Sequence, residues 1–116
     1  MTISRIIDIL EARLLTKGAD CTREVHTACG SDMMSDVLAY VKDQAVLLTG
    51  LNNPQVVRTA DMMDMKCIVF VRGKRPDEAI LKLARERDIV VMATVLPMYS
   101  ACGKLYLAGL RGESED

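Results

Sequence analysis

The sequence predicts an α/β protein: an open, mainly parallel sheet built from three βα repeats of about 22 residues, with helices on both faces. Three segments each begin with a continuous apolar run and end in proline. These segments are AVLLTGLNNP (45–54), CIVFVRGKRP (67–76) and IVVMATVLP (89–97). The residues that lead the runs, Val46, Ile68 and Val90, are 22 positions apart. Continuous aliphatic runs are typical of strands buried on both faces. We therefore expect three neighbouring parallel strands, at 46–49, 68–71 and 90–93.

Each proline is expected to open a helix, because its missing N–H group would have no partner in the first helical turn. Parallel strands also need crossover connections of this length between them. Apolar residues recur at helical spacing after each proline. They are Val56, Val57, Ala60 and Met63 after Pro54, Ala79, Ile80, Leu83 and Ala84 after Pro76, and Met98, Ala101, Cys102, Leu105 and Gly109 after Pro97.

The chain before these repeats predicts a helix, a short strand and a second helix. Residues 3–12 place isoleucine and leucine on one helical face, and residues 24–28 have the composition of a short strand. The second helix is expected to start from a cap at Ser31 or Asp32 and to end near Asp43.

The length of the chain predicts one domain, and its balanced charge predicts no strong electrostatic field around it. The 116 residues suffice for one domain, which we place at 1–110, followed by a polar tail at 111–116. The 15 Lys and Arg residues nearly balance the 16 Asp and Glu residues, so we expect neither nucleic acid nor an anionic membrane as a partner. No apolar run reaches the roughly 20 residues of a membrane span. A cytoplasmic protein is the expectation.

The four cysteines form no C-x-x-C pair and are expected to be reduced thiols. The stretch CTREVHTAC places Cys21, His26 and Cys29 close together, where they would supply three metal ligands. The spacing lacks the paired short intervals of zinc sites. The alternative is a turn followed by a strand, and we expect no metal.

Ligand-binding residues are expected in the loops after the three strands, because ligands of open parallel sheets bind beyond the carboxyl ends of the strands. Gly50 permits close backbone approach, and Asn53 is placed to cap the helix behind it. The loop RGKR (72–75) offers cations that suit phosphate or carboxylate. The candidate residues are Gly50, Asn52, Asn53, Arg72, Gly73, Lys74 and Thr94.

Each of these residues also has an interpretation without a ligand. Asparagine before proline is a common helix start, and the glycines can simply turn the chain. The cations can be ordinary solvated surface. Thr94 is expected to cap the last helix rather than to contact a ligand, and Arg58 is expected at a surface or an interface.

The motifs of several enzyme classes are absent from the sequence. It contains neither G-x-x-x-x-G-K-[ST] nor a strand followed by G-x-G-x-x-G. The single histidine, His26, has no evident acid partner, and Asp61 and Asp64 are expected to be solvated helix residues. We therefore expect no catalytic activity. A phosphotransfer enzyme is the less favoured alternative, since it would need a metal or a base that the sequence does not show.

The order of elements, with SDMMSDVLAYVKDQAVLLTG followed by the proline-opened repeats, resembles the DRTGG domain family over residues 3–108. The resemblance implies an α/β regulatory module of the kind present in pyrophosphatases with cystathionine-β-synthase (CBS) domains and in a phosphotransacetylase, and similar to the amino-terminal domain of HPr kinase. It also implies a homodimer and, in some members, nearby adenine nucleotides. Stand-alone members occur in anaerobic bacteria and archaea, often encoded beside iron-only hydrogenase components.

The motif that names the family is altered in this chain. Its Asp-Arg pair falls on Leu51 and Asn52, and its Thr-Gly-Gly falls on Val71, Arg72 and Gly73. The resemblance therefore implies that this version binds any family ligand differently or not at all.

Our leading hypothesis is a non-catalytic, homodimeric regulatory or sensory domain that binds a small anionic ligand, such as an adenine nucleotide, or a partner protein through these loops. The second hypothesis is an interaction module of an anaerobic redox system, with methionines on two helices as the contact surface. The alternative is that these methionines only fill the core. They are Met33, Met34, Met62, Met63 and Met65.

Overall fold

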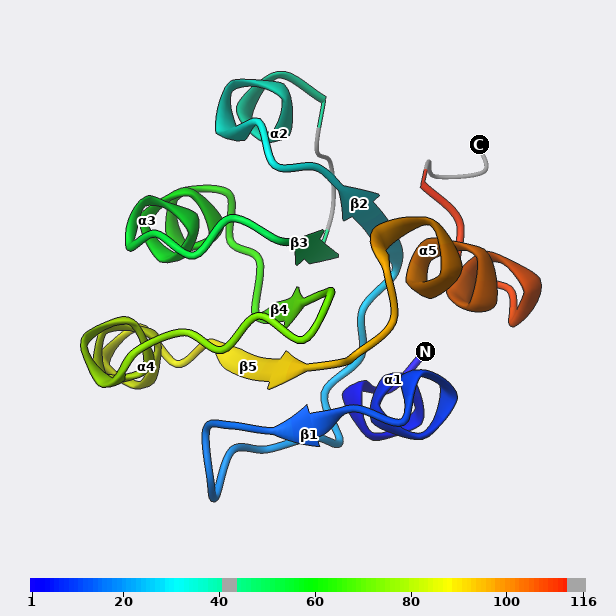
Figure 1. Cartoon of the computed structure of the whole chain (residues 1–116), viewed down its shortest axis with the longest axis horizontal. Coiled ribbons are helices and arrows are strands. Elements are labelled where there is room, and N and C mark those ends of the chain that lie inside the picture. The colour runs from blue at the N-terminus through cyan, green and yellow to red at the C-terminus, as the bar shows by residue number, and fades with distance from the viewer. Residues whose placement is uncertain (41–43, 113–116) are drawn as a thin grey trace.

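The computed structural model describes residues 1–40 and 44–112, whose helices and strands alternate from α1 to α5 (Figure 1). None of the helices in these two ranges has the length and apolar character needed to cross a membrane. In chain order the elements are α1 (Ile3–Leu10), β1 (Arg13–Leu14), β2 (Thr27–Gly30), α2 (Met34–Tyr40), β3 (Ala45–Thr49), α3 (Gln55–Met62), β4 (Cys67–Phe70), α4 (Glu78–Glu86), β5 (Val90–Ala93) and α5 (Met98–Leu107).

The strands form one open sheet in the order β1-β5-β4-β3-β2. Strands β2, β3, β4 and β5 are parallel, and the register sets Val46 opposite Cys67 and Cys67 opposite Val90. The predicted side-by-side arrangement of the three repeats is therefore confirmed. Strand β1 pairs antiparallel with β5 and forms one edge of the sheet. Sequence reasoning did not identify β1, because two residues are too few to show a strand pattern.

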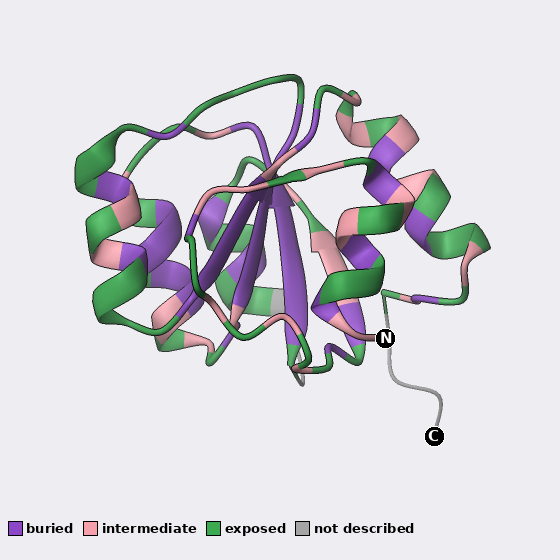
Figure 2. Cartoon of the chain, turned by 90° about the horizontal axis from the view of Figure 1, so that it is seen from below, coloured by how far each residue is buried: buried purple, intermediate pink, exposed green. Residues whose placement is uncertain are grey.

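Helices cover both faces of the sheet, as predicted. Helices α1 and α5 lie over one face and α2, α3 and α4 over the other (Figure 1). Successive strand residues point to opposite faces, so Val46 and Leu48 pack toward α1 and α5 while Leu47 packs toward the other helices. All three side chains are fully buried, and Figure 2 shows the central strands as the buried middle layer. The continuous apolar runs follow from this double burial.

Two boundaries in the amino-terminal part differ from the prediction. Helix α1 ends at Leu10 rather than at residue 12, because Glu11 adopts a left-handed conformation with φ 48°. The predicted strand at 24–28 begins instead at Thr27, since Glu24 forms an isolated antiparallel bridge with Thr2. The extended chain thus first pairs with the amino-terminal segment and only then enters the sheet.

The second helix also starts later than its predicted caps suggest. Helix α2 begins at Met34, and Ser31 Oγ accepts a hydrogen bond from Met33 N, ahead of the helix. The carboxylate of Asp32 does not cap α2 but turns toward the end of β3. The predicted helix end near Asp43 lies outside the described residues.

The prolines that opened the predicted helices lie one or two residues before α3, α4 and α5. Asn53 Oδ1 accepts a hydrogen bond of 2.8 Å from Gln55 N at the start of α3, as expected for a helix-initiating asparagine. Asp77 caps α4 by accepting a bond of 3.0 Å from Ile80 N. After α5 the chain returns to the sheet, where the carbonyl of Arg111 accepts a hydrogen bond from Ala28 N.

Candidate functional site

The loops that follow β3, β4 and β5 lie together at the end of the sheet where these parallel strands end, which we call the carboxyl edge. The backbone N–H of Arg72 donates to Leu96 O at 2.8 Å, and that of Gly73 donates to Thr94 O at 2.9 Å. These two bonds fasten the β4–α4 loop to the β5–α5 loop. The expected position of these loops beyond the carboxyl ends of neighbouring parallel strands is therefore confirmed.

The β4–α4 loop reverses through a tight turn at Arg72 and Gly73. Both residues have positive φ angles, 59° and 69°, and Lys74 N closes the turn with a 3.2 Å bond to Val71 O. Glycine adopts such angles without a steric penalty, which explains Gly73. The turn directs the next two residues, Lys74 and Arg75, to the surface, where both side chains are exposed.

The cation at the centre of this edge, Arg72, is held by a carboxylate from another loop. Its Nη2 lies 3.6 Å from Asp32 Oδ2. Asp32 Oδ1 also accepts hydrogen bonds from Gly50 N at 2.7 Å and from Thr49 Oγ1 at 3.0 Å. The bond from the Gly50 N–H lowers the pKa of Asp32, and the Thr49 hydroxyl and the charge of Arg72 lower this pKa further against the effect of partial burial. Asp32 is therefore charged at neutral pH and offsets the charge of Arg72.

Asp32 is the residue of this edge that sequence reasoning missed. A residue just after the buried strand β2 must emerge at the carboxyl edge, because β2 runs parallel to β3. That signal was available only once the short strand had been placed at Thr27–Gly30. Without it, an aspartate before a helix indicates a cap.

Gly50 provides the close approach that we expected, but the group that approaches is Arg72. A Cβ atom built on Gly50 would lie 2.0 Å from Arg72 Nη2. Gly50 itself is buried. The glycine therefore makes room for the guanidinium group within the protein.

The remaining candidate residues make hydrogen bonds that shape the loops. Asn52 Nδ2 donates to Arg75 O at 3.2 Å, which ties the β3–α3 loop to the β4–α4 loop. Thr94 Oγ1 donates to Leu10 O at 2.9 Å and accepts from Leu96 N at 3.3 Å, and Thr94 is 3% exposed. The prediction that Thr94 caps the last helix is wrong, because α5 begins after Pro97 without a side-chain cap.

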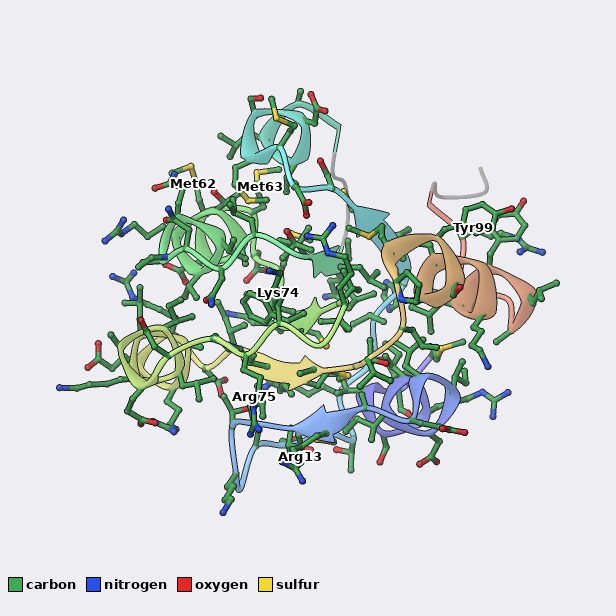
Figure 3. The ribbon with its side chains drawn as sticks, in the orientation of Figure 1. Arg13, Met62, Met63, Lys74, Arg75 and Tyr99 are labelled. Atoms are coloured by element: carbon green, nitrogen blue, oxygen red, sulfur yellow. The ribbon has the colours of Figure 1, made fainter. Side chains whose placement is uncertain are left out.

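Beside these loops lies a cavity of about 190 Å³ with a cationic rim. Arg75 reaches it from the β4–α4 loop and Arg13 from β1, and Figure 3 places Arg75 between β5 and β1. Across residues 1–40 and 44–112, neither Arg13, Lys74 nor Arg75 forms a salt bridge. Two cations that line this cavity, Arg13 and Arg75, are thus available to an anion, and Lys74 is a third such cation in the neighbouring loop. Its lining consists of Glu11, Arg13, Leu15, Gly73, Arg75, Ala93, Thr94 and Val95.

The other polar residues considered from the sequence lie away from this edge or in ion pairs. His26 precedes β2 and so lies at the amino ends of the strands. Asp61 pairs with Arg87 at 2.7 Å, and Asp64 pairs with Lys66 at 3.4 Å. In the part of the chain that the structure describes, no three His, Cys, Asp or Glu residues are placed to hold a metal ion.

The thiols are held in their neutral form by burial. Desolvation raises the pKa of Cys29 and of Cys102, and it raises the pKa of the fully buried Cys67 most strongly. Desolvation, with a contribution from Asp20, also raises the pKa of Cys21. Of the residues in CTREVHTAC, Cys21 lies in a turn and Cys29 in β2, and His26 directly precedes that strand.

Comparison with known proteins identifies both a family and a fold relative. Residues 5–106 match the family model of the DRTGG domain. A similar fold occurs in the crystal structure of the CBS and DRTGG domains of the regulatory region of Clostridium perfringens pyrophosphatase, complexed with the activator diadenosine tetraphosphate. The TM-score is 0.72 at 16% sequence identity, over 90% of this chain and 45% of that chain. The chain thus spans less than half the length of that relative. No curated protein sequence matches it.

Proposed function

The chain belongs to the DRTGG domain family, and from that premise we propose that it is a non-catalytic regulatory domain that binds an adenine nucleotide at the carboxyl edge of its sheet. The phosphates of the nucleotide bind the cations of the β4–α4 loop. The partner that the domain regulates then responds to whether the nucleotide is bound.

The observation that carries this proposal is a pair of cations on a fixed turn, Lys74 and Arg75, which form no salt bridge with any residue in 1–40 or 44–112. Lys74 and Arg75 follow a reversal that two backbone bonds fasten to the neighbouring loop. Because Arg72 is already offset by Asp32, Lys74 and Arg75 are the loop cations left for an outside anion. A guanidinium group and an ammonium group carried on a fixed backbone turn suit a phosphate.

The other candidate residues take supporting roles in this proposal. Gly73 lets the backbone approach the phosphate, and Asn52 and Asn53 are exposed in the neighbouring β3–α3 loop. Gly50, Arg72 and Thr94 hold the loops from within through the contacts described above. A nucleotide is favoured over other anions because the relative with the same fold is complexed with diadenosine tetraphosphate.

Calorimetric titration of the full chain with ATP tests the proposal. We expect saturable binding, and we expect the double variant Lys74→Ala, Arg75→Ala to weaken it by about tenfold or more, since each charged hydrogen bond contributes about 1.5–3 kcal/mol. The matched control is Lys104→Ala with Arg58→Ala, which removes the same charges from exposed positions on α5 and α3. No binding at millimolar ATP, or equal loss in both double variants, would overturn the proposal. Release of phosphate from ATP would overturn the non-catalytic part.

We also propose that the domain is a homodimer, with the outer face of α5 as the contact. On α5, Tyr99 is 90% exposed and Leu107 is 88% exposed. Large apolar side chains grouped on one helix are typical of an interaction surface. Figure 3 shows Tyr99 pointing away from the sheet.

A second candidate function is binding of a partner protein through α2 and α3. Met34 and Met65 are buried, so for these two the core interpretation holds. Met33, just before α2, is 60% exposed, Leu38 on α2 is 41% exposed and Met62 at the end of α3 is 72% exposed. Helices α2 and α3 pack against each other (Figure 1). Methionine-rich surfaces adapt to partners. Co-purification from the native host with Met33→Lys and Met62→Lys variants tests this function, and retention of the partner in both variants would exclude it.

A further inference from the structure

A groove extends from the cationic cavity along the edge strand β1. Leu14 packs toward α1 and α5, whereas Leu15 packs toward the core under α4. Strand alternation places Arg13 on the same side as Leu15. Between β1 and α4 lies a second cavity of about 710 Å³, which shares Arg13, Leu15 and Arg75 with the cavity of about 190 Å³. The two cavities therefore adjoin each other at these residues, and together they make up the groove.

The groove has cationic walls over an apolar floor. Its larger part is lined by four cations, Arg13, Lys17, Arg75 and Arg85, and by one carboxylate, Glu78. Arg85 is offset by Glu78 at 2.9 Å. Within residues 1–40 and 44–112, the other three cations have no ion pair. Leu15 and Leu81 supply apolar surface between them, and the remaining lining residue is Leu14.

We propose that this groove holds a polyphosphate chain, so that the domain prefers nucleotides with three or more phosphates over monophosphates. This inference rests on the proposed nucleotide-binding function. Arg75, common to both cavities, binds the phosphate nearest the loops, and Arg13 and Lys17 bind the phosphates that follow along β1. Three cations spaced along one groove match a linear row of negative charges better than a single phosphate.

A polyphosphate ligand would neutralise Arg13 and Arg75. These two cations line the same cavity, which has fewer carboxylates than cations. Glu11, at the mouth of the smaller cavity, is the one acidic side chain there. The larger cavity lies within the range of about 300–1,000 Å³ that small-molecule sites occupy. The groove is therefore large enough for a phosphate chain together with part of a nucleoside.

Titration of the full chain with AMP, ADP, ATP and inorganic triphosphate tests the inference. We expect affinity to rise by about tenfold or more from AMP to ATP, and triphosphate alone to bind. The variants Arg13→Gln and Lys17→Gln should remove most of this gain while leaving AMP affinity unchanged. Arg58→Gln on α3 is the matched control and should leave the whole series unchanged. Glutamine removes the charge but keeps a polar side chain on the exposed surface, and thermal unfolding verifies that the variants are folded.

The outcomes separate this inference from the proposed function. If AMP and ATP bind equally and Lys74→Ala weakens both, the inference is overturned and the proposed function stands. If no nucleotide binds, the proposed function is overturned as well. An oligoglutamate peptide that binds as tightly as triphosphate, and loses affinity in Arg13→Gln, would assign the groove to acidic peptides instead and would overturn the inference.

Discussion

The guanidinium group of Arg72 lies directly on Gly50. A Cβ atom at position 50 would lie 2.0 Å from Arg72 Nη2 and 2.6 Å from Arg72 Cζ. The Gly50 N–H donates to the carboxylate of Asp32, which also faces Arg72. Three residues from the loops after β2, β3 and β4 thus contact one another, and they fix the edge of the sheet on which the proposed site is built.

Replacing Gly50 by alanine should displace Arg72. The guanidinium group is the end of a flexible side chain, so the cost is the loss of its contact with Asp32, about 0.5–1 kcal/mol for a partly exposed ion pair. In an Arg72→Ala background the same glycine substitution should cost less by that amount. A double-mutant cycle by urea unfolding measures the difference. Strictly additive free energies of unfolding would show that the two residues do not interact.

Asp32 should make stability depend on pH. Its pKa is lowered in the folded protein, first by the Gly50 N–H, so its contribution is present above the unfolded-state pKa of about 4 and is lost as the pH falls through the lower folded-state pKa. The melting temperature of the wild type should therefore exceed that of Asp32→Asn at roughly pH 6–7, and this difference should disappear in strong acid. Asp8→Asn, at an exposed position on α1, is the control. A gap that stays constant down to strong acid would contradict the assignment.

Thr94 should matter for stability rather than for ligand binding. Its buried hydroxyl donates to Leu10 O, so Thr94→Val leaves a buried carbonyl without its donor, at a cost of about 1–3 kcal/mol. Thr59 is the matched control, since its buried hydroxyl finds no hydrogen-bond partner among the described residues. Thr59→Val should be neutral or stabilising. Chemical unfolding of both variants measures the contrast, and equal effects would refute it.

The outer face of α5 should control self-association if the proposed dimer forms there. Leu107→Glu and Tyr99→Glu place charge within the exposed apolar group, and each should raise the dimer dissociation constant by about tenfold or more. Lys82→Glu changes the charge of an exposed position on another helix, α4, and should have a smaller effect. Light scattering after size exclusion gives the mass. A dimer that persists in both apolar variants would place the contact elsewhere.

The repeats were predictable because their pattern follows from burial on both sides. Val46, Ile68 and Val90 begin strands whose residues are all apolar, and such runs have few other interpretations. Strand β1 was not predictable, because its two residues gain their pairing from β5, far along the chain. The proposed role of Arg13 depends on that pairing and therefore could not be predicted from the sequence.

Prediction of the candidate site from the sequence was limited in the same way, because the partners of single side chains could not be identified. The sequence placed Lys74 and Arg72 at the correct edge, since strand direction alone determines this. It did not distinguish a free cation from one offset by Asp32, because the partner comes from a loop 40 positions earlier. Long-range pairings of polar side chains have no periodic signature.

Amide chemical shifts of the full chain, followed by heteronuclear NMR as ATP is added, test the central proposal most directly. We predict saturable shifts at Gly73, Lys74 and Arg75 and at the neighbouring Val95, with small changes at His26 and Lys66 on the opposite edge of the sheet. Shifts confined to that opposite edge, or no shifts at saturating ATP, would contradict a nucleotide site at the carboxyl ends of the strands.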